Sequence, residues 1–141
     1  RTARHSGPRR ELVPAVITLG GRRTALTALV DTGNTLTDPV TNRPVMVAEG
    51  EKLVSLFPEG ECPGEGDLRD PVASLERLSQ GAGKGRWRLL PYQAVGVDCG
   101  MLLALRTDGV RVGEEDYGGI LVALAPGRLS DGGGYSALIG A

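Results

Sequence analysis

One short segment has the residue types for acid–base chemistry. Asp31-Thr32-Gly33 directly follows the apolar run Ala28-Leu29-Val30. A carboxylate on a turn after a buried strand is aimed at one point, and Gly33 lets the backbone bend sharply or approach another chain closely. Thr32 can donate a hydrogen bond within the turn, and such a carboxylate can activate a water molecule as a general base. The alternative is an ordinary turn in which the aspartate bonds to its own backbone.

The pattern apolar-apolar-Asp-Thr-Gly resembles the signature of aspartic proteases. Those enzymes use two facing carboxylates that share one proton, because two like charges ~3 Å apart cannot both ionise. This chain has one such motif, since Asp98-Cys99-Gly100 lacks both the hydroxyl residue and a continuous apolar strand before it. With 141 residues the chain is also short for two lobes. If Asp31 is catalytic, we expect the second aspartate to come from a second copy of the chain, in a symmetric homodimer.

The segments around the motif are predicted to be mainly strands. The chain contains 22 Gly and 9 Pro in 141 residues, and helix interiors tolerate neither residue well. Two β-branched, apolar runs at 12–19 and 24–30 flank Gly20-Gly21 and predict a β-hairpin. Further short strands are predicted at 44–48, 87–95, 101–106, 110–112 and 120–124.

Two short helices are predicted between the strands. Apolar residues at spacings of three and four predict a helix within 49–60. Residues 60–70 are rich in Gly and Pro and are predicted to form an exposed loop. Asp70 as N-cap and Pro71 at the first helical position predict a second helix that ends near residue 80. Its apolar face is expected to consist of Val72, Leu75 and Leu78.

Composition argues against several other functions. Lys plus Arg is 16 and Asp plus Glu is 17, so the chain lacks the basic excess that neutralises phosphates, and we expect no nucleic-acid partner. The single histidine, His5, leaves little material for a zinc site or a Ser-His-Asp site. We therefore expect no metal and no cofactor. Cys62 and Cys99 are either two idle thiols or a disulfide pair.

The order of segments after the motif is similar to a retroviral-type protease subunit. A glycine-rich hairpin tip with Val95, Gly96, Val97 and Gly100 precedes a returning strand, and Leu138-Ile139-Gly140 closes the chain. This resemblance implies a mainly β, retropepsin-like, closed β-barrel-like half of an aspartic protease, with one or two short helices inserted at about 50–80. It also implies that the hairpin is a flap over substrate and that the closing segment supports the catalytic loop. An ordinary glycine hairpin and an ordinary terminal strand remain the alternatives.

A more specific resemblance covers residues 28–139. The segments VDTGNTLTDP, RPVMVAE, LPYQAVG, GMLLALR and YSALI resemble the sporulation sigma-E factor processing peptidases, and they occur in that family's order. The resemblance implies an aspartic endopeptidase domain at residues 11–141, preceded by a flexible basic tail or linker at 1–10. Its implied reaction is removal of the pro-sequence from a sporulation sigma-factor precursor, pro-sigma-E.

The resemblance also assigns roles to individual residues. Asp31 is implied to be catalytic, and Thr32, Gly33 and Asn34 to support its loop. Asn34 stands where retroviral enzymes usually have Ala, and Gly140 stands where the sporulation family often has another residue.

Partners and location are implied in the same way. The implied partners are a second copy of the chain, the sigma-factor precursor, and a secreted forespore signal protein. The signal is expected to act through an N-terminal transmembrane region that is absent from this chain. The whole protein is expected at the cytoplasmic face of the mother-cell membrane, at the septum, and this fragment is expected to be soluble. The alternative function is a catalytically silent peptide-binding or dimerisation module of the same fold.

Overall fold

The fold is known from a computed structural model that describes residues 10–33, 36–81, 84–94 and 97–140. Three residues singled out from the sequence, Asn34, Val95 and Gly96, lie outside the described residues, as does the side chain of Val97. No helix in the described part of the chain is long and apolar enough to cross a membrane.

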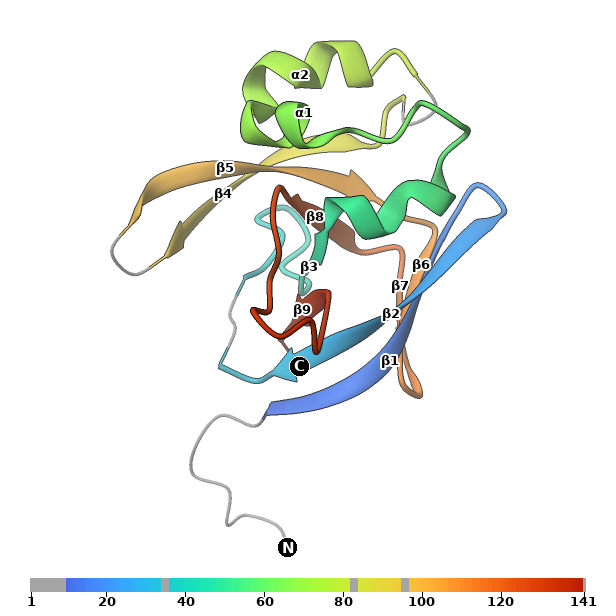
Figure 1. Ribbon diagram of the computed structural model, residues 1–141, viewed down its shortest axis with the longest axis vertical. Coiled ribbons are helices and arrows are strands. Elements are labelled where there is room, and N and C mark those ends of the chain that lie inside the picture. Colours follow the sequence, from blue (N-terminus) through green and yellow to red (C-terminus); the bar gives the residue numbers. More distant parts are fainter. Residues whose placement is uncertain (1–9, 34–35, 82–83, 95–96, 141) are drawn as a thin grey trace, which may run out of the picture.

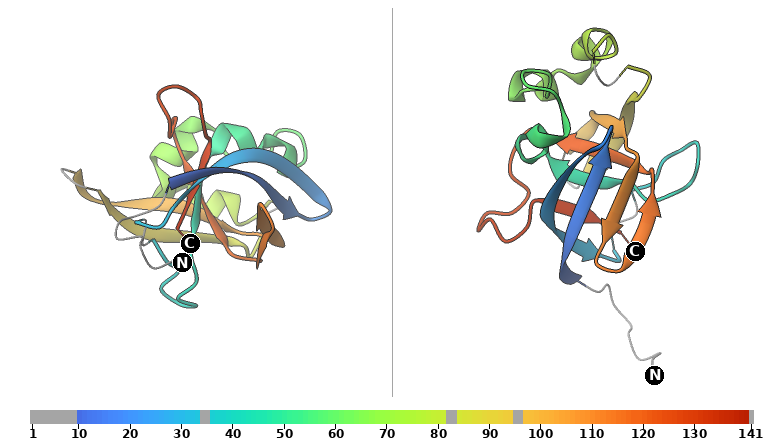
Figure 2. Two further views of the ribbon diagram at one scale, coloured as in Figure 1. Left: turned by 90° about the horizontal axis from the view of Figure 1, so that it is seen from below. Right: turned by 90° about the vertical axis from the view of Figure 1, so that its right-hand side faces the viewer.

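The fold is mainly β, as predicted, and it is built on one nine-stranded sheet. The sheet is open, with the strand order β4-β5-β8-β3-β9-β2-β1-β6-β7, and it curls around the core, as one half of a retropepsin-like protein does (Figures 1 and 2). The strands are β1 (Arg10–Leu19), β2 (Arg22–Asp31), β3 (Met46–Glu49), β4 (Trp87–Ala94), β5 (Val97–Arg106), β6 (Gly109–Val112), β7 (Glu115–Gly118), β8 (Leu121–Ala125) and β9 (Ala137–Ile139).

The predicted first hairpin is confirmed. β1 and β2 pair along their whole length, and Leu19 faces Arg22 across a two-residue turn. Gly20 and Gly21 have φ of 59° and 82°. A type I′ hairpin turn needs positive φ at both central residues, which glycine adopts at little cost. This turn sets the register that brings β2 to its end at Asp31.

The last strand occupies the centre of the sheet. β9 pairs in parallel with β2, where Leu29 faces Leu138 and Val30 faces Ile139, and it pairs antiparallel with β3. Strands β2 and β3, which are consecutive in sequence, are therefore separated in the sheet by β9, a strand from the far end of the chain. Burial explains its stability, because Ala137 and Ile139 are fully buried in the core.

The core has two parts. The larger part lies inside the curled sheet and extends under the helices. A smaller apolar cluster is formed by side chains of β4, β5, β8 and the segment before β3. The buried members of this smaller cluster are Val45, Leu90, Leu102, Ala104, Leu121 and Ala123.

Three short helices lie between β3 and β4: the 3-10 helix η1 (Gly50–Leu56), α1 (Glu65–Arg69) and α2 (Pro71–Leu78). Helix α2 packs on β4 and β5, and η1 packs on β2 and β3 (Figure 1). The ring of Phe57 stacks on Trp87 with 5.9 Å between ring centroids.

The insertion departs from the prediction in two details. Helix α1 lies in the segment 60–70 that was predicted to be a loop, and that prediction was wrong. Two side-chain interactions support this helix: Asp67 Oδ2 accepts a hydrogen bond from Gly64 N (3.0 Å), and Arg69 pairs with Glu65. In α2 the expected core residue Val72 is 61% exposed, because the helix buries Ser74 and Leu78 instead.

Candidate active site

Asp31 ends β2 at a tight turn. Its Oδ1 accepts a hydrogen bond from the backbone N–H of Gly33 at 2.9 Å. Its Oδ2 lies 3.6 Å from Nε of Arg10, the residue opposite it in the β1–β2 ladder. The Asp31 side chain is 24% exposed, and Thr32 and Gly33 are exposed. The carboxylate is therefore fixed by an Asx-type turn and by the end of β2, where Ala28 and Leu29 are buried, while it remains open to another molecule.

Strand β9 lies directly beside the strand that carries Asp31. Leu138 and Ile139 pair with Leu29 and Val30, the two residues that precede Asp31, and the buried Gly140 follows them. The sequence-predicted closing segment and the Asp-Thr-Gly loop are therefore neighbours in space, although about a hundred residues separate them.

The β4–β5 hairpin lies above the end of β2 in the view of Figure 1. The sequence placed Gly100 in its tip, and this was wrong. The strand β5 begins at Val97, so Asp98-Cys99-Gly100 belongs to a strand, and Gly100 faces Tyr92 of β4. Residues 95 and 96, between β4 and β5 in the sequence, lie outside the described residues. Asp98 is thus a strand residue of the hairpin and does not follow a buried strand as Asp31 does.

An open cleft of about 660 Å³ lies beneath this hairpin. The cleft is lined both by the segment that follows the Asp31 loop and by strand β9, which lies beside the strand that carries Asp31. Its lining residues are Leu36, Thr37, Val47, Pro91, Tyr92, Leu102, Ala125, Pro126, Leu129 and Leu138.

Sequence reasoning did not identify this cleft. Within β4 the cleft is lined by Pro91 and Tyr92, whereas Leu90 belongs to the buried apolar cluster, so the alternation of this strand does not reveal the cleft. The other lining residues come from five separate segments, and their proximity is a property of the sheet order.

Cys62 carries a free thiol. It is half-buried, and burial raises the pKa of the Cys62 thiol to about 11 because the thiolate loses hydration. The thiol is therefore protonated at neutral pH and is not a nucleophile of the site. The side chain of Cys99 lies outside the described residues.

Fold and site together define a class: a mainly β, retropepsin-like half in which a strand ends on Asp-Thr-Gly beside the closing strand. The family model described as Peptidase_U4, Sporulation factor SpoIIGA, matches residues 3–141. The chain belongs to this family.

Two curated relatives are each named sporulation sigma-E factor-processing peptidase. The protein from Priestia megaterium is 34% identical over 105 residues, which cover 72% of this chain and 33% of the relative. The protein from Bacillus subtilis is 29% identical over 134 residues, which cover 92% of this chain and 43% of the relative. The chain thus spans less than half the length of either relative. No solved structure matches the chain significantly.

Proposed function

We propose that this chain is an aspartic endopeptidase domain that removes the pro-sequence of a sporulation sigma-factor precursor, pro-sigma-E. The names of the relatives support the substrate. The observation that carries the catalytic proposal is the position of Asp31: a partly exposed carboxylate on a tight turn, anchored by a buried strand and by β9. One chain contributes one such carboxylate. The second is Asp31 of another copy, so the active site forms on the axis of a homodimer.

The proposed mechanism needs the two Asp31 carboxyl groups in different protonation states. The ionised one takes a proton from a water molecule, and the water oxygen attacks the carbonyl carbon of the scissile peptide bond. The protonated one donates its proton to the carbonyl oxygen. The tetrahedral intermediate then collapses and the C–N bond breaks. The leaving nitrogen takes the proton that the first Asp31 removed from water, and the second Asp31 takes back a proton from a hydroxyl of the intermediate, which becomes the product carboxylic acid. No covalent enzyme intermediate and no metal is required.

The other sequence-predicted residues have supporting roles in this proposal. Thr32, Gly33 and Asn34 brace the loop against its counterpart in the other copy. Leu138, Ile139 and Gly140 support it from behind, which is consistent with the β2–β9 pairing. The hairpin that includes Val95, Gly96, Val97 and Gly100 closes over an extended peptide, which can add to the exposed edge of β4 as a further strand.

Regulation follows from a shared site. A dimer with one site on its axis is inactive below its dissociation constant. We propose that the isolated domain associates weakly and that an N-terminal membrane region of the whole protein raises its local concentration. A secreted forespore signal protein would act on that region, at the mother-cell membrane.

Co-expression with the sigma-factor precursor tests the proposal. The chain, fused to a dimeric coiled coil, should shorten the precursor on a gel, and the unfused chain should do so more slowly. Asp31→Asn should leave the precursor intact, and Asp70→Asn, an exposed carboxylate on the helix insertion, should behave as wild type. Equal shortening by Asp31→Asn would assign the cleavage to a host protease. An intact precursor beside a folded, dimeric wild-type fusion would favour the silent peptide-binding module.

A further inference from the structure

The cleft beneath the β4–β5 hairpin has an uncharged lining that includes accessible aliphatic surface. Leu36, Val47, Leu129 and Leu138 line it and are each only partly buried, so aliphatic surface remains accessible to a ligand. None of the described residues that line it is charged. A charged ligand group there would lose hydration without gaining a partner, whereas an apolar group would gain by leaving water.

The cleft adjoins the Asp31 loop on two sides. Leu36 follows Asp31 by five positions, and Leu138 is the parallel neighbour of Leu29, two residues before Asp31. A peptide held at Asp31 therefore has a side chain within reach of this cleft. Because the cleft adjoins the Asp31 loop, the ligand group expected in it is a side chain of the peptide whose backbone lies at Asp31.

Tyr92 forms the hairpin side of the cleft. It faces Gly100 across the ladder, and a Cβ at Gly100 would lie 3.4 Å from Cε1 of the Tyr92 ring. The ring therefore lies against the glycine, at van der Waals distance from where an alanine Cβ would be, so a residue larger than alanine at position 100 would have to share this space with the ring. Gly100 thus leaves room for the aromatic wall.

The opposite wall is held by a buried carboxylate. Glu49 is 4% exposed, and its Oε2 accepts a hydrogen bond from the backbone N–H of Leu129 at 2.8 Å. Because a buried carboxylate is costly to leave unpaired, this bond fixes Leu129 at the rim. Both walls of the cleft are therefore positioned before any ligand binds.

We infer that this cleft is the subsite for one large apolar side chain of the peptide substrate, and that Tyr92 sets its size limit. Tyr92 is then a specificity-determining residue. The inference rests on the proposed protease function, so its test has a binding arm that needs no turnover.

The binding arm uses the Asp31→Asn chain with labelled Leu and Val methyl groups and three small probes. N-acetyl-leucinamide and N-acetyl-phenylalaninamide should shift the methyl resonances of Leu36, Leu102 and Leu138 at millimolar concentration. N-acetyl-aspartamide should not. Leu53, a fully buried residue of η1 that does not line the cleft, is the internal control. Equal shifts with all three probes, or shifts at Leu53 alone, would overturn the inference.

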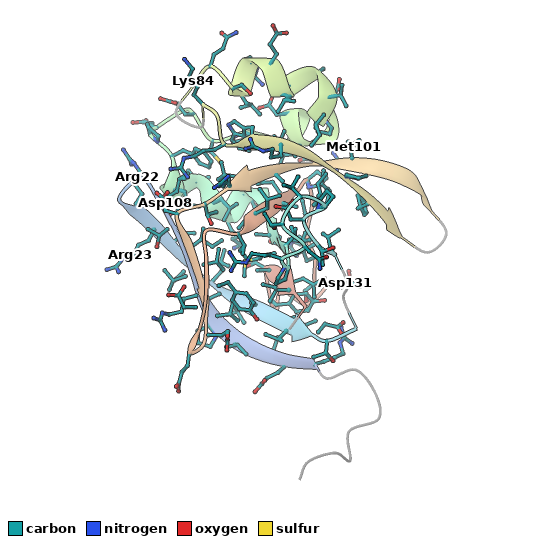
Figure 3. The ribbon with its side chains drawn as sticks, turned by 180° about the vertical axis from the view of Figure 1, so that it is seen from behind. Arg22, Arg23, Lys84, Met101, Asp108 and Asp131 are labelled. Atoms are coloured by element: carbon teal, nitrogen blue, oxygen red, sulfur yellow. The ribbon has the colours of Figure 1, made fainter. Side chains whose placement is uncertain are left out.

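The turnover arm begins by mapping the cleaved bond in the precursor. Peptides around that bond then carry Ala, Leu, Phe or Asp at each flanking position. One position should prefer Leu or Phe over Asp by more than about tenfold in kcat/KM, the scale expected for apolar pocket contacts. Tyr92→Ala should change the preference at that position alone, and Tyr92→Phe should retain it. Met101→Ala, on the other face of the same hairpin (Figure 3), is the matched control.

The two arms separate the two proposals. Apolar probes that bind in the cleft, together with a folded, dimeric wild-type chain that leaves the precursor intact, would support the apolar site and refute the protease. Cleavage with the same preferences in wild type and Tyr92→Ala would support the protease and refute the subsite.

Discussion

Arg10 Nε lies 3.6 Å from Asp31 Oδ2, and the two residues are opposite each other at the end of the β1–β2 ladder. In a single copy of the chain, the candidate catalytic carboxylate is therefore held by its own turn and by a cation that is 63% exposed. Exposed ion pairs contribute about 0–1 kcal/mol. The contact is weak enough to give way when a second carboxylate approaches.

Arg10→Gln should therefore change the free energy of unfolding by less than about 1 kcal/mol, because an exposed ion pair is weak. Urea denaturation measures it, and Arg23→Gln, at the exposed end of the same hairpin (Figure 3), is the control. A loss above about 2 kcal/mol would mean that Arg10 anchors the Asp31 loop, since surface substitutions rarely cost that much.

Two substitutions at Asp31 should separate folding from catalysis. Asp31→Asn keeps an oxygen that accepts the Gly33 N–H, so its stability should match wild type while turnover is lost. Asp31→Ala removes the acceptor and should cost a further 0.5–1.5 kcal/mol or so, the usual net value of a hydrogen bond. Chemical denaturation beside the cleavage assay gives both values. Residual turnover by Asp31→Asn near the wild-type rate would exclude Asp31 as a catalytic group.

Asp108 links the first hairpin to the base of β5. It accepts hydrogen bonds from Gly20 N (2.7 Å) and from Arg86 (2.8 Å), close to the β1–β2 turn (Figure 3). The Gly20 N–H, and then the Arg86 guanidinium, hold the pKa of Asp108 below its usual range. A depressed carboxyl pKa in the folded state stabilises the fold above the unfolded-state pKa, and this stabilisation disappears as the pH falls through the folded-state pKa.

Asp108→Asn should accordingly lower stability at pH 7, by about 1 kcal/mol or less because the group is largely exposed. The difference from wild type should shrink as the pH falls below the normal carboxyl range. Thermal unfolding from pH 7 to pH 2 measures this, with Asp131→Asn on an exposed loop as the control for loss of one negative charge. A gap that stays constant down to pH 2 would show that the carboxylate charge plays no part.

Gly119 meets the backbone closely. A Cβ there would lie 2.6 Å from the carbonyl oxygen of Thr107, whose own hydroxyl donates a buried hydrogen bond to Ile120. Gly119→Ala should cost about 1–3 kcal/mol through this backbone clash. Gly127→Ala, where a Cβ meets nothing within 4 Å, should stay within about 0.5 kcal/mol of wild type. Equal effects of the two substitutions on the denaturation midpoint would contradict the predicted clash.

Cys62 should react slowly with alkylating reagents. Its pKa of about 11 leaves a thiolate fraction at pH 8 that is on the order of 100-fold below that of an ordinary thiol with pKa 8.5. A Cys99→Ser chain has Cys62 as its single thiol, and its iodoacetamide rate relative to free cysteine measures the effect. In denaturant this ratio should rise towards one. A native rate equal to that of free cysteine would contradict the burial.

Several elements could be predicted because their causes are local. Gly20-Gly21 between two β-branched runs specifies the first hairpin, since positive φ at two successive residues excludes most other turns. Asp70-Pro71 correctly marks the start of α2. The turn at Asp31 also follows from its own residues, because the Gly33 N–H lies within reach of the Asp31 carboxylate. The candidate catalytic residue was therefore visible without the fold.

Other features could not be read from neighbouring residues. Helix α1 is five residues long, and its single buried residue, Leu68, is stabilised by packing on distant segments. The position of Gly100 in β5 depends on its pairing with Tyr92, and no local signal marks where a hairpin strand begins. The exposure of Val72 depends on which side of α2 the sheet covers.

By itself, the sequence determined the mainly β character, the first hairpin and the carboxylate that the site requires. The tertiary structure decided what surrounds that carboxylate. It placed β9 between β2 and β3, and it assembled the cleft from Leu36, Tyr92, Leu129 and Leu138. The physical reason is range: φ preferences and turn hydrogen bonds act over a few residues, whereas sheet order is chosen by burial of apolar strands that are far apart in the chain.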